Sequence, residues 1–321
     1  MKKYSPPVAF AFFLFLFVSG FLSPVKMYAQ LSIPEIEGRW DMTVGEEGKG
    51  QPSWLEVVHS GHKRLVGHFV GTGGSARPIS QVFYKDGKIS FSLPPQWEAA
   101  DNDFVFEGSL KDGKLSGTMT AANGKSYPWT AVKAPALRPN TAPVWGKPIQ
   151  LFNGKNLDGW EYRGSTNQWV VENGILKSPK AGANLVSIQK FEDFKLHIEF
   201  RYAKGSNSGI YLRGRYELQV IDSYGKDPAK DLMGAVYGFI SPTEMAAKPA
   251  GEWQTYDIAL VGRFVSVTLN GKQVICNQEI PGITGGALDS REGEPGPIYF
   301  QGDHEGSIEF RNIVITPAKK G

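Results

Sequence analysis

Apolar and polar residues alternate along most of this 321-residue chain, in short runs separated by turns that contain glycine. Because successive side chains of a β-strand point to opposite faces, such alternation predicts antiparallel strands with one buried and one solvated face. Helical periodicity is limited to a weak candidate at residues 242–248. The chain is therefore predicted to be all-β.

The first part, residues 30–133, is predicted to form a small antiparallel meander, closed into a barrel or curved as a sheet. We expect roughly six to eight strands there. The sequence places them at 38–44, 54–58 and 65–70, and then around the turn signals Asp86-Gly87, Asp112-Gly113 and Asn123-Gly124. Asp-Gly and Asn-Gly pairs favour the tight turns of β-hairpins, which supports a meander.

A proline-rich segment follows at residues 134–148. Proline has no backbone N–H to donate to a neighbouring strand, and its ring stiffens the chain. We therefore predict a linker between two folded parts at this point.

The second part, residues 149–317, is predicted to be a two-sheet jelly-roll sandwich. Its strand candidates are 169–176, 185–187, 194–202, 208–212, 216–221, 253–261, 264–269, 298–301 and 307–316. Many short strands joined by tight turns and long loops are typical of such sandwiches.

The stretch 207–222 carries the chemistry that stands out most in the second part. Leu218 and Val220 point to one face of the predicted strand, and Glu217 and Gln219 point to the other. If the strand extends back to Arg213, a guanidinium joins the polar face. Carboxylate, amide and guanidinium groups form planar hydrogen bonds that suit sugar hydroxyls. The alternative is an ordinary solvated strand face.

The first 29 residues are predicted to be a signal peptide. Lys2 and Lys3 precede an apolar run at 8–22, which is too short for a comfortable membrane span, and a small residue, Ala29, marks a cleavage point. We expect a periplasmic or secreted protein without a stable membrane span, with a retained anchor as the alternative. The single cysteine, Cys276, allows no intramolecular disulfide and is predicted to be buried.

Charge narrows the range of partners. Without the three lysines of residues 1–29, 32 basic side chains face 32 acidic ones. A chain with no excess of positive charge lacks the broad basic surface that nucleic acids require, so we expect no nucleic-acid partner. The aromatic content of 12% and the 38 glycines suit an all-β protein.

The second part resembles a known family, the 3-keto-disaccharide hydrolase domain, whose members share a concanavalin-like jelly roll. The resemblance covers about half of the chain and depends on motifs that occur in the family's order. They are LFNGKNLDGW (151–160), WVVENGIL (169–176), FKLHIEFR (194–201), NSGIYLR (207–213), YELQVID (216–222), GAVY (234–237), GEWQTY (251–256), NGK (270–272) and FRNI (310–313). The loop QGDHEG at 301–306 is similar to the family's closing motif but differs in spacing.

The resemblance implies an exported enzyme that cleaves glycosidic bonds of sugars oxidised at C3. A ketone at C3 acidifies the hydrogen on C2, so a base can remove it and form an enolate. The enolate then expels the group on C1, and water can add to the resulting enone. Such a site needs a base, donors for the enolate oxygen and an acid for the departing oxygen.

Three residues are predicted to be catalytic. His304 lies on a loop beside Asp303 and Glu305, and histidine side chains titrate near neutral pH, which suits a base, an acid or a metal ligand. Glu217 is the second candidate base, and Arg213 is expected to point outward and bind the ketone oxygen. A divalent cation held by His304, Glu217 and Asp222 stays open as an alternative.

Six further residues are predicted to bind the oxidised oligosaccharide or glycoside. They are Asn207, Gln219, Asp222, Tyr237, Trp253 and Gln301. Asp222 could instead cap a turn, and Trp253 could instead be a buried aromatic residue. Two other functions are kept open. One is a non-catalytic carbohydrate-binding module, and the other is an interaction domain in an exported complex.

Overall fold

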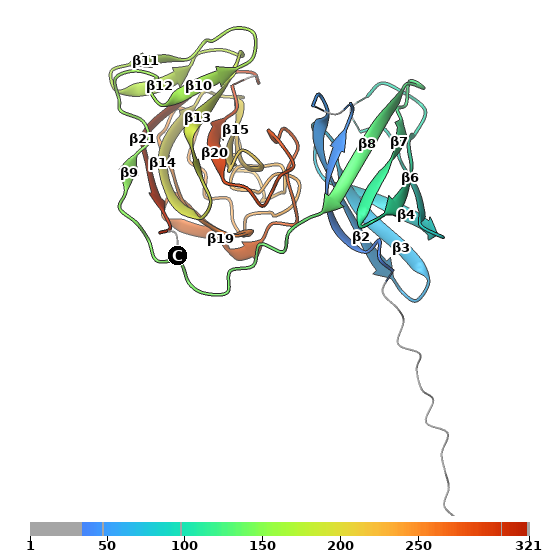
Figure 1. Cartoon of the computed structure of the whole chain (residues 1–321). Coiled ribbons are helices and arrows are strands. Elements are labelled where there is room, and N and C mark those ends of the chain that lie inside the picture. The colour runs from blue at the N-terminus through green and yellow to red at the C-terminus, as the bar shows by residue number, and fades with distance from the viewer. Residues whose placement is uncertain (1–33, 47, 97, 303, 320–321) are drawn as a thin grey trace, which may run out of the picture. The chain divides into compact units, whose positions relative to one another are not determined.

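The computed structural model describes residues 34–46, 48–96, 98–302 and 304–319 (Figure 1). The predicted signal peptide and its cleavage point lie outside the described residues. The described part contains strands, turns and irregular chain but no helix, so the all-β prediction is confirmed. Residues 242–248, the weak helical candidate, are irregular. Within the described residues there is consequently no helix long and apolar enough to cross a membrane.

The first eight strands form a closed antiparallel barrel, coloured blue to green in Figure 1. They are β1 (Gly38–Val44), β2 (Gln51–Ser60), β3 (Arg64–Val70), β4 (Arg77–Lys85), β5 (Lys88–Leu93), β6 (Phe104–Lys111), β7 (Lys114–Thr120) and β8 (Ser126–Lys133). Pairing between β1 and β8 closes the barrel. At the β4–β5 hairpin Asp86 and Gly87 both have positive φ, 51° and 74°, as the predicted tight turn requires.

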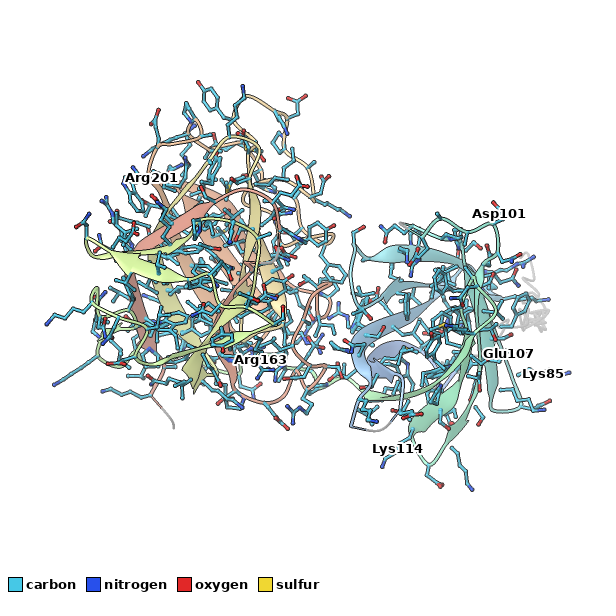
Figure 2. All side chains as sticks on the ribbon, turned by 90° about the horizontal axis from the view of Figure 1, so that it is seen from above. Lys85, Asp101, Glu107, Lys114, Arg163 and Arg201 are labelled. Carbon is cyan, nitrogen blue, oxygen red and sulfur yellow. The ribbon has the colours of Figure 1, made fainter. Side chains whose placement is uncertain are left out.

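Alternation separates the barrel's interior from its surface. Trp40, Phe106 and Trp129 are almost fully buried inside it, and the ring of Phe106 stacks on Phe91 at 4.6 Å. Figure 2 shows Lys85, Glu107 and Lys114 extending away from the barrel into solvent. A short curved sheet can bury its apolar face without a second layer only by closing on itself, which explains the barrel.

The remaining strands form a two-sheet sandwich, which confirms the jelly-roll prediction. One sheet has five strands in the order β10 (Trp160–Arg163), β13 (Asn184–Phe191), β20 (Gly296–Phe300), β15 (Asn207–Leu212) and β16 (Tyr216–Ile221). The other follows the order β11 (Val170–Glu172), β12 (Ile175–Ser178), β21 (Ile308–Pro317), β14 (Phe194–Tyr202), β17 (Gln254–Val261), β18 (Phe264–Leu269) and β19 (Lys272–Glu279), with β9 (Ile149–Gln150) paired to β21. The two inner faces meet through ring stacks such as Phe300 on Phe310, 4.3 Å apart.

The predicted burial of Cys276 is wrong, because its side chain is exposed. The pairing of β18 with β19 shifts register between Val267 and Thr268, which leaves an extra residue in β19. Such a bulge breaks the alternation, so Val274 and Ile275 are both buried and the next side chain turns outward.

Apolar contacts join the barrel to the sandwich core, and the described residues of both belong to one compact unit. Trp54 of β2 and Val70 of β3 belong to the same buried cluster as the sandwich residues. The Trp54 ring meets Phe239 edge-on at 5.4 Å. The proline-rich segment contributes as well, because Arg263 donates to the carbonyl oxygen of Pro135 at 3.0 Å.

A carboxyl pair lies in this contact region. Asp41 of β1 is 8% exposed and hydrogen-bonds to Glu292, which is fully buried and lies 2.8 Å from the Arg263 guanidinium. Burial, followed by the neighbouring Glu292, raises the pKa of Asp41 to about 9. Asp41 is therefore protonated at neutral pH while Glu292 pairs with the guanidinium.

Replacing Asp41 by Asn is expected to flatten the pH dependence of stability. An ordinary aspartate has a pKa of about 4 in the unfolded chain, so between roughly pH 4 and pH 9 the native state binds more protons than the unfolded state. The free energy of unfolding of the wild type therefore falls as pH rises through this window. Asparagine carries no such proton. The free energy of unfolding of the variant, relative to that of the wild type, should therefore rise by about 1–3 kcal/mol from pH 5 to pH 8.

Urea unfolding at pH 5, 6.5 and 8 measures this effect. Asp112→Asn is a matched control, because Asp112 is exposed in a hairpin turn at φ 50°, which asparagine also adopts readily. Parallel pH profiles for wild type and the Asp41 variant would contradict the assignment of the proton to Asp41.

Candidate active site

A cavity of about 250 Å³ lies on the five-stranded sheet, on the face opposite the core. Alternation along β15 and β16 explains this placement, since Ile210 and Leu218 are fully buried in the sandwich core. The neighbouring side chains therefore point the other way. The cavity is lined by Thr72, Gly73, Gly74, Asn207, Tyr211, Glu217, Gln219, Tyr237, Gly285, Gly286, Tyr299, Gln301 and His304.

Glu217 is the buried carboxyl group of the cavity, with 4% of its surface exposed. Its partner across the β15–β16 ladder is Tyr211, whose hydroxyl lies 2.9 Å from Glu217 Oε2 and also 2.9 Å from the Gly285 carbonyl oxygen. A side chain at Gly209 would crowd Glu217, because its Cβ would lie 2.9 Å from Cγ of the glutamate. Glycine at that position thus leaves room for the carboxylate.

Tyr211 and Tyr237 supply hydroxyl groups beside Glu217. Tyr211 stacks on Tyr299 of β20, with ring centroids 4.3 Å apart, and both rings are almost fully buried. Tyr237 is half-buried, and burial, together with the nearby carboxylates of Glu217 and Asp231, raises the pKa of its hydroxyl. Tyr237 therefore stays protonated at physiological pH and can donate a proton or a hydrogen bond.

Two amide side chains present acceptors to the cavity. Asn207 Oδ1 and Gln301 Oε1 are buried, and neither has a hydrogen-bond partner among the described residues. Buried acceptors without partners are rare in folded proteins, and a bound ligand or water can supply the missing donor. Gln219 differs, because its amide already contacts backbone groups of Val220 and Asp231 at 3.0 and 3.3 Å.

His304 reaches the cavity from the loop that follows β20. The loop is held against β15, since the backbone N–H of Asn207 donates to the carbonyl oxygen of Glu305 at 3.2 Å. Gly302 on its other side donates to Asn184 Oδ1 at 2.8 Å. The imidazole is exposed, so it lies at the solvent side of a cavity whose base carries Glu217.

Six of the nine residues predicted from the sequence line this cavity: Asn207, Glu217, Gln219, Tyr237, Gln301 and His304. Arg213 does not, and the expectation that its guanidinium points outward is wrong. It is 2% exposed and donates to the Tyr216 hydroxyl and the Gly262 carbonyl oxygen at 3.0 and 2.9 Å.

Asp222 and Trp253 also lie outside the lining. Asp222 accepts a hydrogen bond at 3.0 Å from the backbone N–H of Gly205, which lies in the turn between β14 and β15. The ring of Trp253 contacts two guanidinium groups, those of Arg201 at 4.8 Å and Arg311 at 3.9 Å from its centroid. Among the described residues no three His, Cys, Asp or Glu side chains gather as metal ligands, and Asp222 does not line the cavity with Glu217 and His304.

Some lining residues were missed in the sequence. Tyr211 shares a strand face with Asn207, so the same alternation could have identified it. Gly285, Gly286 and residues 72–74 come from loops, whose positions no periodicity predicts.

Comparisons with known proteins find relatives of the second part of the chain. A curated protein named 3-keto-disaccharide hydrolase, from Bacteroides thetaiotaomicron, is 27% identical over 144 residues, covering 33% of this chain and 49% of its own. The chain thus spans about half the length of that relative. Two Parabacteroides distasonis proteins with crystal structures, provisionally described as glycosyl hydrolases, are 29% and 27% identical. They cover 56% and 53% of this chain and 92% and 98% of their own, with TM-scores of 0.46 and 0.43.

Residues 147–316 match the family described as the 3-keto-alpha-glucoside-1,2-lyase-like domain. This region holds the whole sandwich from β9 to β20 and all but the last residue of β21, together with every cavity residue except the three from the β3–β4 loop. The chain therefore belongs to the 3-keto-alpha-glucoside-1,2-lyase-like family.

Proposed function

We propose that this protein cleaves the glycosidic bond of 3-keto-glycosides by elimination across C1 and C2, followed by addition of water. The observation that carries the proposal is the meeting of Glu217, His304 and Tyr237 around one cavity that also holds the unpartnered acceptors of Asn207 and Gln301. Family membership supports the substrate class.

The reaction begins with removal of the hydrogen on C2. Glu217 takes this proton in the proposed mechanism. The electron pair of the broken C2–H bond moves toward the C3 ketone to give an enolate. Burial of the carboxylate beside the Tyr211 hydroxyl holds it in a fixed position, which favours proton transfer over random encounter.

The enolate then expels the group on C1. The C1–O bond breaks, a C1–C2 double bond forms, and the departing oxygen accepts a proton. Tyr237 and His304 are the candidate donors, since the hydroxyl of Tyr237 stays protonated and His304 lies at the solvent side. Water then adds across the double bond, with its OH bonding to C1 and its proton going to C2, to give the free 3-keto sugar. The proton held by Glu217 passes through solvent to the group that protonated the departing oxygen, so both groups return to their starting states.

The amide acceptors orient the sugar in this proposal. Hydroxyl groups of the ring donate to Asn207 Oδ1 and Gln301 Oε1, which satisfies both buried oxygens. The export that residues 1–29 predict would suit an enzyme acting on extracellular or periplasmic glycosides.

The purified protein is expected to release methanol from methyl 3-keto-α-glucoside and to leave methyl α-glucoside intact. The ketone alone makes the C2 hydrogen acidic enough for a carboxylate to remove. Proton NMR in D₂O measures both methanol release and deuterium at C2 of the product. Cleavage of the unoxidised glucoside at a similar rate, or product without deuterium at C2, would rule out the elimination route.

A carbohydrate-binding module is the second candidate function. Asn207 and Gln301 would bind ordinary sugar hydroxyls equally well without any chemistry. Calorimetric binding of unoxidised glycans together with no turnover of the 3-keto-glycoside would favour this candidate.

A further inference from the structure

One wall of the cavity comes from the barrel. Thr72, Gly73 and Gly74 lie in the loop between β3 and β4 and line the same cavity as Glu217 and His304. The family match begins at residue 147, so this wall is supplied by a part of the chain outside the matched region.

Contacts on both sides hold this loop in place. The backbone N–H of Gly286 donates to the Thr72 carbonyl oxygen at 2.8 Å. A Cβ at Gly238 would lie 2.8 Å from Cβ of Ser75, so the loop packs directly against the chain that carries Tyr237. Ser75 is fixed in turn by the side-chain amide of Gln96, which donates to its hydroxyl at 2.9 Å.

The two ends of the loop are anchored in the sandwich core. Val70, at the end of β3, is fully buried in that core, and Ala76 packs against it. A loop tied at its ends and along its length keeps one shape, so it acts as a fixed wall rather than a mobile flap.

We propose that the β3–β4 loop of the barrel limits the size of the glycoside that the cavity accepts. The proposal rests on the proposed function. The cavity's volume of about 250 Å³ is small beside the roughly 300–1,000 Å³ of typical small-molecule sites. One sugar ring fills most of it, and the loop closes the side on which residues 72–74 lie.

Gly73 offers a direct test. Its φ is not in the left-handed region, and a Cβ there would have no atom within 4 Å, so a Cβ can be added without a clash or backbone strain. Gly74 is unsuitable, because its φ is 80°. The series Gly73→Ala, Gly73→Leu and Gly73→Trp therefore adds volume to the cavity wall in steps.

The measurement is kcat/KM of the full chain with methyl 3-keto-α-glucoside and with the 3-keto derivative of a glucose disaccharide. We expect kcat/KM to fall further as the side chain at position 73 grows. In Gly73→Trp the fall should be about tenfold or more greater for the disaccharide than for the methyl glycoside. Ser116→Trp, at an exposed position of β7 away from the cavity lining, should match wild type on both. Thermal unfolding of each variant checks that the fold is kept.

Wild-type kinetics in Gly73→Trp, or an equal loss on both substrates, would overturn size selection by the loop and leave the proposed function standing. A wild-type protein that neither cleaves nor binds either glycoside would overturn both proposals.

Discussion

Replacing Glu217 by Gln is expected to lower kcat for 3-keto-glycoside cleavage by about 10²–10⁴-fold, the range typical of a lost general base. Glutamine keeps the size of the side chain and can still contact the Tyr211 hydroxyl, but it cannot take the C2 proton. The KM should change little, because the amide acceptors of Asn207 and Gln301 remain in place. Steady-state kinetics and the rate of C2 deuterium exchange are the readouts.

Glu172→Gln is the matched control, since Glu172 is exposed on β11 and lies outside the cavity lining. His304→Ala separates the two catalytic candidates. If His304 donates to the departing oxygen, its loss lowers cleavage but leaves C2 exchange intact. Full activity in the double variant Glu217→Gln, His304→Ala would refute the assignment of roles.

Replacing Arg263 by Met is expected to destabilise the fold by about 3–5 kcal/mol, as when one partner of a buried ion pair is removed. Glu292 is fully buried, and its carboxylate would lose the guanidinium 2.8 Å away. The same guanidinium donates to the carbonyl oxygens of Pro281 and Pro135, at 2.6 and 3.0 Å. The free energy of unfolding in urea measures the loss.

An exposed ion pair provides the comparison. Arg291 lies 3.4 Å from Asp289 with 62% of its side chain exposed, so Arg291→Met should change stability by no more than about 1 kcal/mol. Adding Glu292→Gln to Arg263→Met removes the stranded charge and should restore part of the loss. Equal losses of stability in Arg263→Met and Arg291→Met would contradict a stabilising role of the buried pair between Arg263 and Glu292.

The fold could be predicted because alternation and turn residues agree along most of the chain. β16 and β18 occupy the residues that the pattern indicates, and the Asn270-Gly271 turn beside β18 has both φ values positive, 51° and 81°. Alternation fails where the backbone leaves the extended form. The bulge in β19 reversed the expected orientation of Cys276 in this way.

The same limit explains which site residues could be found. Glu217 and Gln219 lie within a regular strand, so their shared face followed from spacing. Arg213 lies in the turn before that strand, with φ at 53°, and the turn directs its guanidinium over the Tyr216 ring instead of into the cavity. The barrel loop carries no periodic signal, and only tertiary contacts bring Thr72 beside Gly286.

The outward turn of Cys276 has a practical consequence. It is the only cysteine of the chain, and its thiol is accessible on β19, the last strand in the order of its sheet. A maleimide fluorophore or spin label can therefore be attached at one defined place on the wild-type protein. A distance reporter on the sandwich is thus available without removing any native thiol.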